Sequence, residues 1–403
     1  MWAYGNVPTG WKICKVKDYS TVVTDYVANG SFASLAKNVN YKDTEDEAVL
    51  IRLTDFNNGF NGNFVYIDNH AYEFLSKSKL FGGEIIISNV GANVGTVFKC
   101  PYLDKKMSLA PNSIMLKTLG NDDFYYYWFS SRNGQHSLKS IVTGSAQPKF
   151  NKTNFRDLEI PVPPIETQNR IVSILKSIDS KIELNNKINN NLQQQAFALF
   201  DKLLSGEHLE VCALSEIAEL NPKRSLAKNE MARCIDMAQL SASGSFPNGW
   251  QIKPYNGGMR FANGDTLLAR ITPCLENGKT AYIDFLDTDE IAFGSSEYVV
   301  LCSKGQYPSE FFYCLARYPS FVDYAVKNMN GSSGRQRVSA ETIGKYLLPR
   351  LTDDELAEFR DVVPALFSAI RLNSLENIRL SELRDAFLPK LMSGEIDVSD
   401  IDI

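Results

Sequence analysis

The side chains best suited to chemistry in this chain lie in two short polar loops. Residues 144–149 and 331–337 both carry amide, hydroxyl and cationic groups on segments that contain glycine. Such groups bind phosphates, and at base edges Arg pairs with guanine and Gln with adenine. A solvated connection is the alternative reading of either loop. The candidate DNA contacts are Ser145, Gln147 and Lys149 in the first loop and Ser332, Ser333, Arg335, Gln336 and Arg337 in the second.

Further polar side chains follow two short apolar runs, residues 84–88 and 265–268, each of which is preceded by a glycine. Runs of this kind are typical of buried strands. Ser88 ends the first run, Asn89 and Asn93 follow it, and Arg270 and Thr272 follow the second. These five residues are the weaker candidates for DNA contacts.

No pattern in the sequence indicates catalysis. His70, His136 and His208 lie far apart, without the spacing of metal ligands, and they are best read as surface or structural residues. The tetrapeptide that contains Lys279 resembles the end of a P-loop, but Pro273 occupies the position of the first glycine, so the phosphate cradle is missing. Lys279 remains a candidate phosphate contact. We expect no catalytic residue, no metal and no cofactor.

Two long amphipathic segments must position these loops. Residues 161–207 predict one helix with an apolar seam at alternating steps of three and four residues, and residues 349–403 repeat it 188 positions later. Antiparallel pairing of the two helices would place Asn185 opposite Asn377 and Asn189 opposite Asn373, which would fix the register. Four apolar residues lie off the seam, where they either pack on the neighbouring units or dock partner subunits: Phe200, Leu204, Leu388 and Met392.

The segments between the helices repeat as well. Short β-rich runs, an aromatic helix and a polar loop occur in the same order before each long helix. The aromatic run within residues 122–131 reads as core rather than as a platform for base stacking. The sequence therefore predicts an α+β fold with four parts: a unit at 1–160, a helix at 161–207, a second unit at 208–348, and a helix with an acidic tail at 349–403.

Composition sets only broad limits. The chain has 403 residues, 44% of them hydrophobic, and a net charge of −5. Residues 349–403 hold 12 acidic against 6 basic residues, so the two units are close to neutral and can still gather basic side chains on one face. Seven scattered cysteines and the lack of a long apolar run predict a reduced, cytoplasmic protein without a membrane span.

The helix entry "IPVPPIETQNRIVSIL" and the paired endings "LLSGE" and "LMSGE" resemble those of the DNA-specificity subunit of type I restriction-modification enzymes. The resemblance covers the whole chain. It implies a non-catalytic protein whose two target recognition domains read the halves of a split site in double-stranded DNA. It also implies that the helices act as a spacer and as a dock for methyltransferase subunits, and through them for restriction subunits. The alternatives are a DNA-modifying enzyme with an unrecognised active site and a protein-only coiled-coil scaffold.

Overall fold

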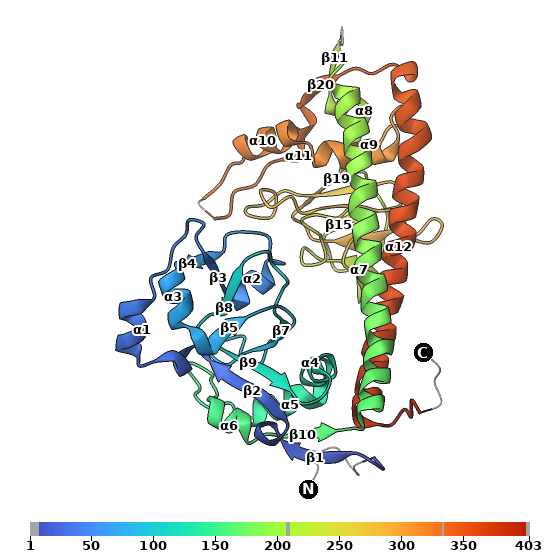
Figure 1. Cartoon of the computed structure of the whole chain (residues 1–403). Coiled ribbons are helices and arrows are strands. Elements are labelled where there is room, and N and C mark those ends of the chain that lie inside the picture. Colours follow the sequence, from blue (N-terminus) through green and yellow to red (C-terminus); the bar gives the residue numbers. More distant parts are fainter. Residues whose placement is uncertain (1–7, 207–209, 333, 400–403) are drawn as a thin grey trace. The chain divides into compact units, whose positions relative to one another are not determined.

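The computed structural model describes residues 8–206, 210–332 and 334–399, and it has the α+β fold expected from the sequence (Figure 1). The chain forms two compact units. Unit 1 combines Met1–Ile178 with Glu382–Ile403, and unit 2 is Asp179–Ser381. The two long helices, α7 (Ile165–Leu204) and α12 (Asp353–Ser393), each contribute one part to unit 1 and one part to unit 2.

Unit 1 is built on two four-stranded sheets and a two-stranded pair. The first sheet has the order β2 (Ser20–Asp25), β9 (Ser113–Thr118), β6 (Ile85–Ser88), β7 (Val97–Lys99). The second has the order β4 (Val65–Ile67), β3 (Ala48–Ile51), β8 (Lys106–Leu109), β5 (Lys79–Leu80), in which β3 and β8 are parallel. The separate pair is β1 (Lys12–Lys15) with β10 (Glu159–Val162), which is antiparallel.

Unit 2 repeats this topology strand for strand. Its first sheet has the order β12 (Ala218–Leu220), β19 (Tyr298–Ser303), β16 (Thr266–Ala269), β17 (Thr280–Tyr282). The second has the order β14 (Gln251–Pro254), β13 (Met231–Ile235), β18 (Ala292–Gly294), β15 (Met259–Phe261), again with one parallel pair, β13 and β18. The separate pair is β11 (Val211–Ala213) with β20 (Leu347–Pro349). The predicted internal repeat is confirmed, since β16 corresponds to β6 and β19 to β9.

Short helices complete both units. The aromatic helix α4 (Asp122–Ser130) begins after Asn121, whose side chain accepts a hydrogen bond from the Asp123 N–H and so satisfies one free donor of the first turn. Its rings are buried in the core of unit 1, as predicted. The others are α1 (Phe32–Asn38), α2 (Leu53–Asn57), α3 (Asn69–Phe74), α5 (Arg132–Ser140), α6 (Lys152–Arg156), α8 (Leu214–Ile217), α9 (Ser309–Ala316), α10 (Pro319–Lys327) and α11 (Ala340–Gly344), with 3₁₀ turns η1 (Val16–Asp18), η2 (Tyr26–Asn29) and η3 (Ser76–Ser78).

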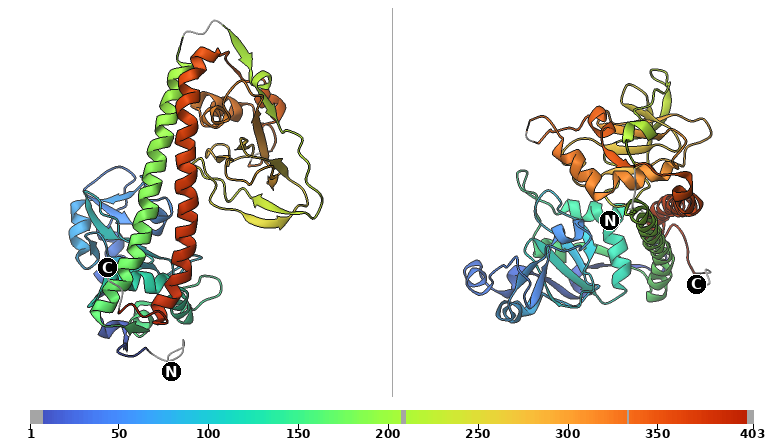
Figure 2. Two further views of the ribbon diagram at one scale, coloured as in Figure 1. Left: turned by 90° about the vertical axis from the view of Figure 1, so that its right-hand side faces the viewer. Right: turned by 90° about the horizontal axis from the view of Figure 1, so that it is seen from above.

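The long helices pack against each other, and they run side by side in the left view of Figure 2. In unit 1, Ile171 and Leu175 of α7 belong to the same buried cluster as Leu391 of α12. In unit 2, Ala196 of α7 belongs to a cluster with Phe359 of α12. The early part of α7 thus packs beside the end of α12, and the late part of α7 packs beside the start of α12. The two helices are therefore antiparallel.

Asparagine pairs lie between the two helices in unit 2. Asn185 Nδ2 donates to Asn377 Oδ1 at 2.9 Å and to Glu376 Oε2 at 2.7 Å. Asn373 Nδ2 donates to Asn189 Oδ1 at 2.9 Å. Both pairs expected from the seam are therefore hydrogen bonded, whereas the role of these residues in fixing the register stays a prediction.

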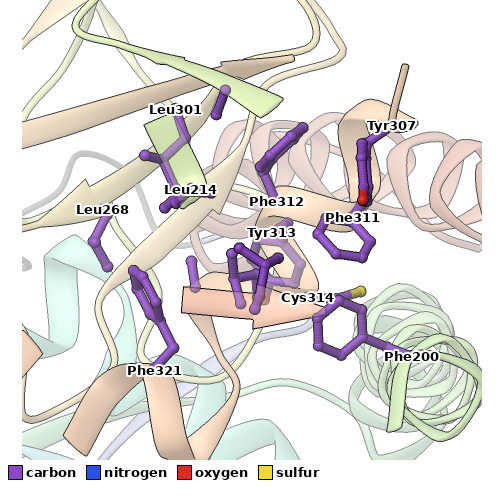
Figure 3. Close-up of a cluster of buried hydrophobic side chains, with 14 of the residues drawn as sticks. Phe200, Leu214, Leu268, Leu301, Tyr307, Phe311, Phe312, Tyr313, Cys314 and Phe321 are labelled. Carbon is purple, nitrogen blue, oxygen red and sulfur yellow. The ribbon is translucent and has the colours of Figure 1, made fainter. Parts of the chain in front are cut away.

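The four off-seam apolar residues all contact the cores of the units. Phe200 is 1% exposed, and its ring lies 5.0 Å from that of Phe311 between centroids. Figure 3 shows Phe200 extending from α7 into this cluster. Met392 is fully buried in the core of unit 1. Leu204 and Leu388 are half-buried against the same two cores. Of the two alternatives for these residues, packing on the neighbouring units is therefore observed for Phe200 and Met392, whereas a role of Leu204 and Leu388 in docking partner subunits stays a prediction.

Candidate nucleic-acid interface

Unit 2 brings its two predicted groups of polar residues together. The segment after β16 lies beside the loop of residues 330–337, and isolated bridges join Arg337 to both Ile271 and Asn330. The Thr272 N–H donates to the Gln336 carbonyl at 3.0 Å. These bonds follow from strand geometry, because each backbone group that leaves the sheet needs a partner. Two loops separated by some 60 residues in sequence therefore form one surface.

Unit 1 has the same pair of loops. Val90, which follows β6, forms a bridge with Lys149, and Thr143 forms a second bridge with Lys149. The Gly91 N–H donates to the Pro148 carbonyl at 2.9 Å. Lys149 thus occupies the position that Arg337 occupies in unit 2, and the two positions are 188 apart in the sequence. The repeat extends from the strands to the loops that carry the candidate contacts.

The loop pair of unit 2 contains a carboxylate that binds two arginines. Arg337 donates from Nε to both carboxylate oxygens of Glu297 at 2.9 Å and from Nη2 to Oε1 at 2.7 Å. Arg270 Nε lies 3.7 Å from Glu297 Oε2. The guanidinium of Arg337 lowers the pKa of the Glu297 carboxyl group below its usual value, because it hydrogen-bonds the charged form. Glu297 therefore stays ionised in this cluster.

Arg335 is the most accessible cation of the same loop. Its side chain is exposed, and among residues 8–206, 210–332 and 334–399 no carboxylate pairs with its guanidinium. Ser332 is also exposed, whereas Gln336 and Arg337 are half-buried. Ser333, the remaining candidate in this loop, lies outside the described residues. All five donors of Arg335 are thus available to a planar acceptor such as a guanine edge or a phosphate.

In unit 1 the accessible groups are Ser145, Gln147 and Lys149, which are exposed in the second loop, together with Asn93 in the first. Ser88 is different, because it is 2% exposed and pairs with Ser113 in the ladder of β6 and β9. As placed, Ser88 belongs to the core and offers nothing to a ligand. Asn89 is half-buried, and its Nδ2 donates to the Phe150 carbonyl at 3.0 Å, so this side chain joins the two loops.

Two candidates of unit 2 also use their side chains inside the protein. The Lys279 ammonium donates to the Met237 carbonyl at 2.9 Å. The Thr272 hydroxyl donates to the Gln336 carbonyl at 3.4 Å, in addition to its backbone bond. Lys279 keeps two of its three donors for a phosphate. Thr272 instead holds the loops together.

Sequence reasoning missed Glu297, and it missed the corresponding residue of unit 1. The Arg270 N–H donates to the Glu297 carbonyl, and the Asn89 N–H donates to the Asn112 carbonyl, so Asn112 occupies the position of Glu297. Glu297 lies directly before β19, and Asn112 lies directly before β9. A turn residue before a strand gives no local signal of this role, which depends on the antiparallel neighbour of that strand.

Other kinds of site find little support in the described part of the chain. Within it, no group of three or more His, Cys, Asp or Glu side chains is arranged to hold a metal ion. None of the helices described in residues 8–206, 210–332 and 334–399 has the length and apolarity needed to cross a membrane.

Comparisons with known proteins point to one family. The sequence profile of the "Type I restriction modification DNA specificity domain" matches residues 8–194. The type I restriction enzyme HindI specificity subunit of Haemophilus influenzae is 22% identical, over 83% of this chain and 84% of that protein. The MjaIX specificity subunit of Methanocaldococcus jannaschii is 24% identical, over 98% and 96%. The S subunit structure from M. genitalium covers 97% of this chain and 99% of that one, with a TM-score of 0.58 and 15% identity, and so shares its fold.

Proposed function

We propose, from the premise that this chain belongs to the family of DNA-specificity subunits of type I restriction-modification enzymes, that each of its two units reads one half of a split site in double-stranded DNA. The chain supplies the specificity of such a system and is not its catalytic subunit. Methylation and cleavage would then be carried out by methyltransferase and restriction subunits that it directs. The expected segments 1–160 and 208–348 would be the two target recognition domains.

The observation that carries this proposal is the duplicated loop pair. Both units place a loop that follows a central strand beside a polar loop that precedes the long helix, with the same bridges in each. The side chains in corresponding positions differ, however: Lys149 stands where Arg337 stands, and Asn112 where Glu297 stands. One scaffold with two sets of side chains suits the recognition of two different sequences.

Within these loops we assign the reading of bases to exposed side chains. Arg335 in unit 2 can pair with the O6 and N7 atoms of guanine, and Gln147 in unit 1 can pair with the N6 and N7 atoms of adenine. Lys149, Lys279 and Ser332 suit phosphate oxygens, which fix the position of the protein on the duplex.

The helix pair offers a separate surface for partner subunits. Leu184 and Ile188 of α7 are 51% and 40% exposed, and Leu372 of α12 is 60% exposed. The first two are at i+3 and i+7 from Lys181, whose ammonium pairs with Glu376 at 3.2 Å. Leu372 precedes Glu376 by four residues, so the three apolar side chains lie on one side of the helix pair. Three exposed apolar side chains around an ion pair fit a docking surface for a methyltransferase subunit.

Reciprocal substitutions test the proposal. Arg335→Ala should reduce discrimination at one half of the site by about 1–3 kcal/mol per base pair read and leave the other half intact. Gln147→Ala should do the converse, so each variant is the matched control for the other. Selection of bound duplexes from a random library, with the full chain, reports both halves at once. A uniform loss across all sequences with either variant would make that residue a phosphate contact.

A separate assay distinguishes this function from a DNA-modifying enzyme. The purified chain is incubated with DNA and labelled S-adenosylmethionine, with and without methyltransferase subunits. We expect transfer of label only when those subunits are present. Transfer by the chain alone would contradict the proposal, and binding without any dependence on salt would argue against a DNA-binding role.

A further inference from the structure

Glu297 is an acidic side chain within a surface that we assign to DNA, where a negative charge opposes binding. We infer that Glu297 is a positioning residue for recognition: it holds the Arg337 guanidinium, and through Arg337 it holds the loop that presents Arg335 to the bases. This inference rests on the proposed function of that loop. It makes Glu297 a determinant of specificity that acts without touching the DNA.

The contacts form a continuous path from Glu297 to the reading side chain. Arg337 uses Nε and Nη2 to bind the Glu297 carboxylate. Its Nη1 donates to the Arg335 carbonyl at 3.0 Å. Three of the five N–H groups of Arg337 are therefore used inside the protein, and its position is set by planar two-point binding to the carboxylate. Arg337 is thus a support for the loop rather than a free contact for DNA.

The loop needs such a support. Its base is closed by two backbone bonds between Asn330 and Arg337, both of 2.9 Å. Nearer the tip, the Arg335 N–H donates to the Ser332 carbonyl at 3.0 Å. Gly331 and Gly334 adopt φ values of +129° and +79°, which glycine allows but does not enforce. The bond from Arg337 to the Arg335 carbonyl ties the tip to the rest of the unit.

Glu297 itself is fixed by the core. Its N–H donates to Ser295 Oγ at 3.1 Å, and its carbonyl accepts from the Arg270 N–H at 3.0 Å. The next residue, Tyr298, is fully buried, and its hydroxyl donates to the Ile235 carbonyl at 3.0 Å. A carboxylate on a residue that directly precedes a rigid strand can hold a flexible loop in one geometry.

Charge gives the inference a second consequence. Glu297 neutralises part of the positive charge of Arg270 and Arg337, which would otherwise attract any phosphate. Removing the carboxylate should therefore strengthen non-specific binding while it weakens discrimination. These opposite changes are not expected from a residue that only stabilises the fold.

The device is confined to unit 2 in the described part of the chain. In unit 1 the corresponding residue is Asn112, which has no charge, and no carboxylate among the described residues pairs with Lys149. Substitution of Glu297 should consequently affect only the half of the site that unit 2 reads.

The test uses the full chain and selection from a random duplex library, with Glu297→Ala and the isosteric Glu297→Gln. The control is Glu290→Ala, because Glu290 also pairs with an arginine, Arg233 at 2.8 Å, with similar exposure of 22% against 26% for Glu297. In both Glu297 variants, the preference for the correct sequence at one half-site should fall roughly tenfold. Glu297→Ala should also steepen the salt dependence of binding to unrelated DNA. The slope of log K against log salt concentration should change by about 0.9 for each arginine released. Glu290→Ala should leave discrimination unchanged at both halves.

A double substitution separates the possible outcomes. If Glu297 acts through Arg335, adding Glu297→Ala to Arg335→Ala should cause no further loss of discrimination. If Arg335→Ala relaxes one half-site but both Glu297 variants discriminate like Glu290→Ala, the inference about Glu297 is overturned while the proposed function stands. If none of the variants changes discrimination, the assignment of the loop to DNA itself fails. Glu297→Gln keeps the shape of the side chain, so it decides the matter if the alanine variant does not fold.

Discussion

Replacing the asparagines between the long helices tests how the sequence chooses one register. Asn185 is fully buried, and its Oδ1 has no hydrogen-bond partner within the described residues. Asn189, Asn373 and Asn377 are half-buried. A layer of this kind is less stabilising than an apolar one, but it penalises every alignment that leaves an amide facing a leucine.

The structure sets the size of the effect. Burying a leucine at position 185 contributes about 2 kcal/mol, and the three half-buried positions contribute less. Loss of the amide hydrogen bonds offsets only part of this gain, because both partners of each pair are replaced together and neither is left unpaired. We expect a net gain of about 2 kcal/mol for the fourfold Asn→Leu variant, which raises Tm by roughly 4–8 °C for a unit of this size. The single variant Asn189→Leu is the control, since it leaves the Asn373 amide unpaired and should lower Tm.

Thermal unfolding followed by circular dichroism measures the stability, and spin labels measure the register. Labels at Lys187 and Arg379, which are exposed on the two helices, report a slip of one heptad as a shift of about 10.5 Å. The fourfold variant should show a higher Tm and more than one distance. A lower Tm with a single unchanged distance would refute the reasoning.

Two further predictions follow from unit 2. Burial raises the pKa of Asp284 from its usual 3.8 to about 7, so the folded state holds a proton that the unfolded state releases, and stability should fall as the pH rises from about 4 to about 7. Urea titrations should show that Asp284→Asn is more stable than the natural protein by roughly 2 kcal/mol at pH 8 and equal to it near pH 4. An equal difference in stability at both pH values would contradict this. Ile188→Glu should weaken copurification with methyltransferase subunits without changing Tm, whereas Leu347→Glu, 63% exposed on β20, should leave copurification intact; weakening by both would argue against a specific dock.

The repeat could be predicted from sequence because its signals are local. Apolar runs such as residues 85–88 and 266–269 recur in the same order before each long helix, and the helical seams recur at a fixed offset. The sequence predicts that the first long helix starts at residue 161, which is too early. Pro161 pairs with Ile13 in the β1–β10 ladder, and the helix begins at Ile165 after the remaining prolines. Strands as short as β5 were not identified, because two residues carry no periodicity.

The candidate site was predictable in composition but not in roles. The sequence identifies residues 331–337 as polar and flexible, yet Arg335 and Arg337 look equivalent in it. They differ because Glu297, 40 positions before Arg337, is brought to that residue by the strand order of the sheet. Ser88 likewise is a polar residue of a type that contacts DNA, but its pairing with β9 directs its side chain into the core. Long-range pairing decides such roles, and a single sequence does not reveal it.

The central claim is that each unit reads its own half of a split DNA site and so directs methylation. A genome-wide map of adenine methylation tests this directly, in cells that supply the methyltransferase subunits together with the natural chain, Arg335→Ala, Gln147→Ala or no chain. We predict a bipartite methylated motif that requires the chain, loses specificity in one half with Arg335→Ala and loses it in the other half with Gln147→Ala. Methylation of the same motif without the chain, or relaxation of the same half by both variants, would contradict the account.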